Sequence, residues 1–159
     1  MKTKYFFISL VFAAFLSSSI PAGNHSLEIG KEAPALSLSN KSKSLADAEG
    51  KYVIVNFWSA DDPDSRMANM KLSKFADSLP QSKVKFIGIC TDADSSLSNE
   101  IMKADGIPFS AISLDASDIT SQTAEDFQIA TGNRSFLIDP FGNLVSVSPS
   151  EEEIKTIVA

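Results

Sequence analysis

Residues 50–66 read GKYVIVNFWSADDPDSR, and this stretch decides the fold. Its first half, Tyr52–Trp58, is an apolar run of strand length in which Asn56 stands out as polar. A strand that is apolar on both faces is typical of the buried centre of a sheet. In the second half Pro63 follows two aspartates, a pattern that starts a helix, and the apolar spacing predicts that helix over 63–79. We therefore expect a central strand that leads through a short acidic loop into a helix.

The rest of the chain alternates strand and helix patterns. Strands are predicted at 84–90, 109–114, 134–138 and 144–147, helices at 95–104 and 117–128, an extended piece at 29–38, and a short turn of helix at 44–49. Residues 139–143 have the composition of a turn between antiparallel strands. Pro149, suited to a first helical position, and a Ser-to-Glu capping-box spacing open a last helix at 148–151. This order predicts an α/β fold, a mixed central β-sheet flanked by helices on both faces.

The N-terminus has the pattern of an export signal. Two lysines precede an apolar run over residues 5–16, and serines and a Pro-Ala-Gly sequence follow it. A membrane-spanning helix needs roughly 20 apolar residues, more than this run offers. We therefore predict a signal peptide over residues 1–22, cleaved after Ser19 or Ala22, and a domain over residues 27–159. The mature chain would have no membrane span and would reside in the bacterial periplasm or cell envelope. A short uncleaved anchor is the alternative.

Composition limits the function classes. The chain has 159 residues, of which 43% are hydrophobic and 21% charged, as expected for one globular domain. The chain has 14 basic and 20 acidic residues, and loss of the two signal-peptide lysines would leave a net charge of −8. This acidity argues against nucleic acid as a partner. The single cysteine excludes an intrachain disulfide and a dithiol centre.

The motifs resemble those of the TlpA/ResA-like thioredoxin-fold proteins, which are related to the AhpC/TSA group. Residues 50–66 are similar to that family's G-K-x-V-x-V-N-F-W-A-x-W-C-x-x-C-R. Residues 29–34 resemble its opening G-x-x-A-P, residues 86–89 its second central strand, and residues 136–142 its F-L-I-D-x-x-G hairpin. The resemblance spans the domain in order. It implies a thioredoxin-like fold and descent from redoxins that catalyse thiol–disulfide exchange.

The departures from the family pattern fall on the chemistry. The family's two cysteines correspond to Asp62 and Ser65, so both the attacking thiolate and the resolving thiol are missing. Four further replacements accompany them: Asp61 for tryptophan, Ala68 for the glutamate of the first helix, Met70 for its kink proline, and Asn133 for the cis-proline. A cis bond before a non-proline residue costs about 2.5 to 4 kcal/mol, so we expect a trans, differently shaped loop there. The resemblance implies a redox-dead member with a degenerate active site, no catalytic residue and no cofactor.

Our preferred hypothesis is a non-catalytic binding module for an extended peptide or an envelope protein. The groove between the first helix and the Asn133 loop would hold that partner. Its candidate residues are Trp58, Asp61, Asp62, Asp64, Arg66, Asn133 and Arg134. The two arginines could hold a carboxylate through bidentate hydrogen bonds, or they could be solvated surface charges. Trp58 could equally be core packing beneath the site.

Two enzymatic or ligand-binding alternatives remain open. Cys90 could retain thiol–disulfide or peroxiredoxin-like antioxidant chemistry, although a lone Cys at a strand end is more commonly a buried apolar residue. Aspartates at 61, 62 and 64 could join Asp92 and Asp94 in a calcium or magnesium site. Against this, Asp62 is well suited to cap the helix that follows. We assign no metal.

A structural role in the envelope is the third hypothesis, in which the fold only supplies a stable surface. Nucleophilic catalysis with a histidine base has no support, because His25 is the single histidine and lies beside the cleavage region. The sequence therefore predicts the fold more sharply than the function.

Overall fold

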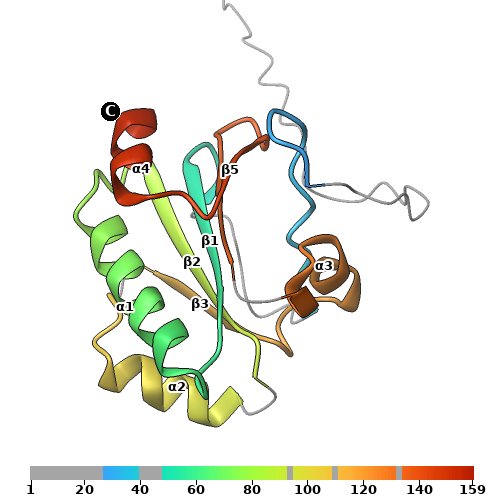
Figure 1. The fold of residues 1–159 in the computed structure, drawn as a ribbon, viewed down its shortest axis with the longest axis vertical. Helices are drawn as coiled ribbons and strands as arrows, with labels where there is room; N and C mark the ends of the chain where they lie inside the picture. Colours follow the sequence, from blue (N-terminus) through green and yellow to red (C-terminus); the bar gives the residue numbers. More distant parts are fainter. Residues whose placement is uncertain (1–26, 40–47, 93–94, 109–110, 132–133) are drawn as a thin grey trace, which may run out of the picture.

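The computed structural model describes residues 27–39, 48–92, 95–108, 111–131 and 134–159 (Figure 1). Its centre is a five-stranded sheet in the order β3-β2-β1-β4-β5. The strands are β1 (Tyr52–Trp58), β2 (Val84–Cys90), β3 (Ile112–Asp115), β4 (Ser135–Ile138) and β5 (Leu144–Val147). β1, β2 and β3 are parallel to one another. β4 pairs antiparallel with β1, and β5 pairs antiparallel with β4. The expected mixed sheet is confirmed.

Helices cover both faces of this sheet. The helices are α1 (Pro63–Asp77), α2 (Ser95–Ala104), α3 (Ser121–Asp126) and α4 (Glu151–Val158). α1, α2 and α4 lie on one face, and α3 lies on the other with the segment that precedes β1 (Figure 1). β1 separates two cores because its side chains alternate: Ile54 packs with α1 and α4, and Phe57 packs with Phe127 at the end of α3.

The second core is built on three aromatic rings. The ring centroids of Phe57 and Phe127 are 5.3 Å apart, and those of Phe127 and Phe136 are 5.1 Å apart. Residues 27–38, which precede β1, cover this core beside the hairpin formed by β4 and β5. There the Gly30 amide donates to the Leu144 carbonyl at 2.8 Å, and the extended conformation expected over 29–38 is present.

The bounds of β1, β2, α2 and β5 match those that the sequence predicts. α3 does not: it is shorter than the predicted helix over 117–128. Its start is set by Thr120, whose hydroxyl accepts the Thr123 amide, and a turn closed by Asp118 precedes it. Its end is set by Gln128, whose left-handed φ of 54° breaks the helix before a 3-10 turn over Ile129–Thr131. β3 also lies later than predicted.

The apolar spacing that predicts α1 starts at Met67, but Met67 is 48% exposed and lies outside the buried face of the helix. The buried residues of α1 are Asn69, Ser73, Phe75 and Ala76. A polar residue faces the sheet there because the Nδ2 of Asn56 donates to the Oδ1 of Asn69 at 2.8 Å. α1 also ends at Asp77, two residues earlier than predicted.

The N-terminus of α4 differs from the prediction by two residues. Ser150 is the cap, and its hydroxyl accepts the Glu153 amide at 3.1 Å, so Pro149 lies before the cap instead of in the first turn. The predicted signal peptide and nearly all of the predicted helical turn at 44–49 lie outside the described residues. Within the described ranges, no helix is both long and apolar enough to cross a membrane.

Candidate functional site

The loop between β1 and α1 leads into Asp62 and Ser65, which correspond to the two cysteines of the family that the sequence resembles, and both make hydrogen bonds to nearby backbone amides. The carboxylate of Asp62 accepts the Asp64 amide at 3.0 Å and caps α1, and Pro63 opens the helix. The hydroxyl of Ser65 accepts the Ser59 amide at 2.9 Å. Asp62 therefore has the capping role that the sequence predicts, and Ser65 holds the loop against the first turn of α1.

Asp92 ties this loop to the end of β2. Its carboxylate accepts hydrogen bonds from the Ser59 hydroxyl at 2.8 Å and from the Ala60 amide. Burial acts to raise the pKa of Asp92 and is the largest single influence, but the bonds from Ser59, Ala60 and Cys90 together lower it. Asp92 is therefore a structural anion that fixes the backbone beside the site.

Cys90 is fully buried at the end of β2, where it packs with Trp58 and Met102. Its thiol donates to the carboxylate of Asp92 at 3.4 Å. Burial raises the pKa of Cys90, and the charge of Asp92 raises it further. Because the thiolate is the nucleophile, these surroundings suppress thiol chemistry.

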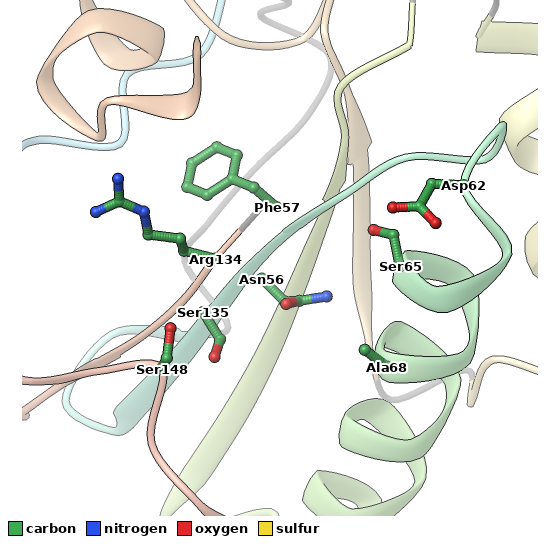
Figure 2. Close-up of a pocket in the computed structure, with 8 residues that line it drawn as sticks. All are labelled: Asn56, Phe57, Asp62, Ser65, Ala68, Arg134, Ser135 and Ser148. Atoms are coloured by element: carbon green, nitrogen blue, oxygen red, sulfur yellow. The ribbon is translucent and has the colours of Figure 1, made fainter. Parts of the chain in front are cut away.

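A pocket of about 400 Å³ lies between α1 and the start of β4 (Figure 2). It is lined by Asn56, Phe57, Asp62, Ser65, Ala68, Arg134, Ser135 and Ser148. Asp62 and Ser65 form its wall on α1, so the pocket includes both positions at which the family has its thiols. Its lining is mostly polar, and its size is in the range of small-ligand pockets.

The wall opposite α1 is built by pairing of strands. Asn56 of β1 and Ser135 of β4 are directly opposite each other in the antiparallel register. Ser148 follows β5, and its amide donates to the Ser135 carbonyl at 2.7 Å. Ser148 has a φ of 53°, a left-handed conformation that a serine rarely adopts. These contacts bring Ser135 and Ser148 together at the pocket.

Arg134 lines the pocket, whereas Arg66 lies outside it. Arg66 does not line the pocket; its guanidinium binds the Asp105 carboxylate through two hydrogen bonds, of 2.6 and 3.2 Å. The hydrogen bond to Asp105 raises the pKa of Arg66. The side chain of Arg134 lines the pocket, and its backbone carbonyl accepts the Phe57 amide at 3.0 Å. The structure therefore brings one of the two predicted arginines to the groove.

Of the remaining candidates, Trp58 is a core residue, 1% exposed, and does not line the pocket. Its Nε1 is a buried polar atom without a hydrogen-bond partner in the described structure. Asp61 and Asp64 are exposed on the loop and first turn. Asn133 and Asp94 lie outside the described residues. Among the residues that are described, no three His, Cys, Asp or Glu side chains converge as a metal site, so the proposed aspartate site gains no support.

Ser135 and Ser148 line the pocket but are not predicted from the sequence, which marks Asn56 and Ala68 only as features of the fold and of the family pattern. Asn56 carried a usable signal, because a lone amide in an apolar strand needs a polar partner or a ligand. Ser135 and Ser148 carried none, since their place depends on the pairing of β4 with β1 and on the backbone turn after β5.

The sequence model of the AhpC/TSA family matches residues 29–147. No curated protein matches the chain. Among solved structures, it is similar to a thioredoxin-like protein from Parabacteroides distasonis, at 23% identity and a TM-score of 0.69, over 83% of this chain and 95% of that one. It is also similar to the thioredoxin domain of a thiol-disulfide oxidoreductase from Bacteroides vulgatus, at 24% identity and a TM-score of 0.70, over 84% of this chain and 100% of that one. A thiol:disulfide interchange protein from Bacteroides sp. matches at 24% identity and a TM-score of 0.67, over 83% and 88% of the two chains. The fold is thioredoxin-like.

Proposed function

Because the chain belongs to the AhpC/TSA family, we propose that it is a thioredoxin-like binding module that has kept the family's groove and lost its dithiol chemistry. The module would hold an extended peptide or a protein partner of the cell envelope. One observation carries this proposal: the polar pocket is lined by Asp62 and Ser65, whereas the single cysteine is buried outside it.

The proposed location is the periplasm or cell envelope. It rests on the lysines, apolar run and small residues of the first 22 positions. Fractionation of cells that express the full chain, with N-terminal sequencing of the product, tests it. We expect a mature N-terminus after position 19 or 22 and an envelope fraction; a cytosolic full-length product would contradict it.

Capture of a partner from envelope extract tests the binding role. The immobilised mature chain is compared with Arg134→Ala, which alters the pocket, and with Arg66→Ala, which removes an arginine outside it. We expect the wild type and Arg66→Ala to retain one specific partner and Arg134→Ala to lose most of it. Equal capture by all three would place binding elsewhere. Absence of any specific partner would favour the purely structural role.

Assays of disulfide reduction and of peroxide consumption test the enzymatic alternative through Cys90. We expect no turnover from the wild type or from Cys90→Ser, because the buried thiol has a raised pKa and no partner thiol. Turnover that the substitution abolishes would overturn the binding proposal in favour of residual thiol chemistry.

A further inference from the structure

The most buried polar side chain that lines the pocket is that of Asn56. Asn56 is 6% exposed, and its Nδ2 donates to the Oδ1 of Asn69 at 2.8 Å. Figure 2 shows its nitrogen turned toward α1 and its oxygen toward the side of Ser135. In the described structure the Oδ1 of Asn56 accepts no hydrogen bond. Because this oxygen is not fully buried, a ligand that brings a donor can reach it from the pocket.

The hydroxyl groups of Ser135 and Ser148 line the pocket together with Asn56. Ser135 faces Asn56 across the strand pair, a position in which side chains of one face are neighbours. Ser148 is held next to Ser135 by the 2.7 Å backbone bond. Because a hydroxyl both donates and accepts, this wall offers a fixed acceptor and two adjustable donors. The group that matches it has a donor and an acceptor of its own.

The charged side chains that line the pocket favour neither an anion nor a cation. The formal charges of Asp62 and Arg134 cancel, and Figure 2 shows the Arg134 guanidinium extending away from Asp62 and Ser65. A carboxylate would meet the carboxylate of Asp62 and the oxygen of Asn56. An ammonium would be attracted by Asp62, but it would meet the charge of Arg134 and the positive end of the α1 dipole. An apolar side chain would remove water from the Asn56 oxygen and leave it unpaired.

We infer that the pocket receives an uncharged primary carboxamide, the side chain of Gln or Asn in the bound peptide. The inference rests on the proposed peptide-binding function and deepens it. The amide N–H of the ligand would donate to the Oδ1 of Asn56, and its carbonyl would accept from the hydroxyls of Ser135 and Ser148. The volume of about 400 Å³ leaves room for the side chain and the adjoining backbone.

Peptide titrations test the inference. Five-residue peptides with a central Gln, Glu, Lys or Met are acetylated and end in an N-methylamide, so that the termini carry neither charge nor a primary amide. They are titrated into the ¹⁵N-labelled mature chain at up to millimolar concentration. We expect the Gln peptide to bind about 2- to 10-fold more tightly than the others, as one or two neutral hydrogen bonds allow, with shifts at Asn56 and Ser135.

Two variants complete the test. Ala68 is exposed on α1 yet lines the pocket, so Ala68→Leu fills the space without disturbing the core, and Met67→Leu is its control on the same helix. We expect Ala68→Leu to lose at least fivefold in affinity for the Gln peptide and Met67→Leu to keep it. We also expect Asn56→Asp, if it folds, to shift preference toward the Lys peptide.

Failure of the inference and failure of the proposed function give different results. If all four peptides bind equally and Ala68→Leu weakens them all, the carboxamide preference is wrong and the binding role stands. If no peptide binds and Ala68→Leu captures partner as the wild type does, both are wrong.

Discussion

The thiol of Cys90 donates a hydrogen bond to the carboxylate of Asp92 at 3.4 Å, so the single cysteine of the chain faces a partly buried anion. In a redox-active thiol the surroundings favour the thiolate. Here burial, and after it the charge of Asp92, act in the opposite direction and raise the pKa of Cys90. The same carboxylate holds the loop at which the family has its thiols. Asp92 therefore joins the end of β2 to the loop before α1, and its charge disfavours the thiolate of Cys90.

Cys90 should be inert in the folded protein. Its pKa is raised, so at pH 8 it holds less thiolate than a free cysteine, whose pKa is about 8.5. It is also fully buried. With a chromogenic disulfide reagent at pH 8, we expect no release in native buffer and one equivalent after denaturation. Rapid reaction of the native chain would contradict the buried, protonated thiol.

Asp92→Asn should destabilise the fold by about 1 to 3 kcal/mol at pH 7, because the amide nitrogen cannot accept the bonds that the second carboxylate oxygen accepts. The wild type gains stability from Asp92 above its unfolded pKa, near 3.8, and loses it as the pH falls through the lower folded pKa. Urea unfolding, followed by the fluorescence of Trp58, measures both effects.

The variant should therefore lose less stability than the wild type between pH 5 and strongly acidic pH. Asp61→Asn is the matched control, since Asp61 is an exposed aspartate of the same loop. We expect its stability to differ little from that of the wild type at either pH. An Asp92→Asn curve parallel to that of the wild type would mean that the carboxylate does not titrate with a lowered pKa.

Periodicity predicted the central elements well because their burial is set by local sequence. β1 and β2 are largely buried on both faces, so an apolar run marks each of them, interrupted by a polar residue only at Asn56 and at Lys85. α1 is different: a polar contact between Asn56 and Asn69 turns its polar residue inward and leaves Met67 at the surface. No apolar pattern contains this pairing, because it depends on which strand residue the helix meets.

The sequence predicted pocket residues mainly where they belong to the family motif. The motif located Asp62 and Ser65, which line the pocket. It also suggested Arg66, which instead pairs with Asp105, 39 residues away in sequence. Ser148 reaches the pocket through a backbone bond and a left-handed φ, and neither has a sequence signature in a serine. Contacts between distant segments therefore account for most of what the sequence left open.

Gly88→Ala should destabilise the fold by about 1 to 3 kcal/mol, the range for overpacked cores. A methyl group there would lie 3.1 Å from the Phe86 ring and 3.4 Å from the Oδ1 of Asn69. It would also lie 3.7 Å from the Trp58 Nε1, so we expect a change in native tryptophan fluorescence. Thermal unfolding and emission spectra measure the two effects.

Gly106→Ala provides the comparison for that variant. No atom lies within 4 Å of a methyl group at this position, but the φ of +65° is strained for alanine. We expect a loss of about 1 to 2 kcal/mol with unchanged native fluorescence. A change of emission in Gly106→Ala, or none in Gly88→Ala, would contradict the packing described around Trp58.

Ser148→Gly should separate stability from binding. Glycine adopts the φ of 53° without strain, so we expect the free energy of unfolding to rise by up to about 1 kcal/mol. The loss of the hydroxyl should weaken the Gln peptide about 2- to 10-fold. Ser148→Ala removes the same hydroxyl but keeps the strain, so it should bind as weakly without the gain in stability. If both variants bind like the wild type, Ser148 does not contribute to the pocket. If both bind weakly and only glycine stabilises, the strained serine is explained by the ligand it serves, since strain of this kind persists where function requires it.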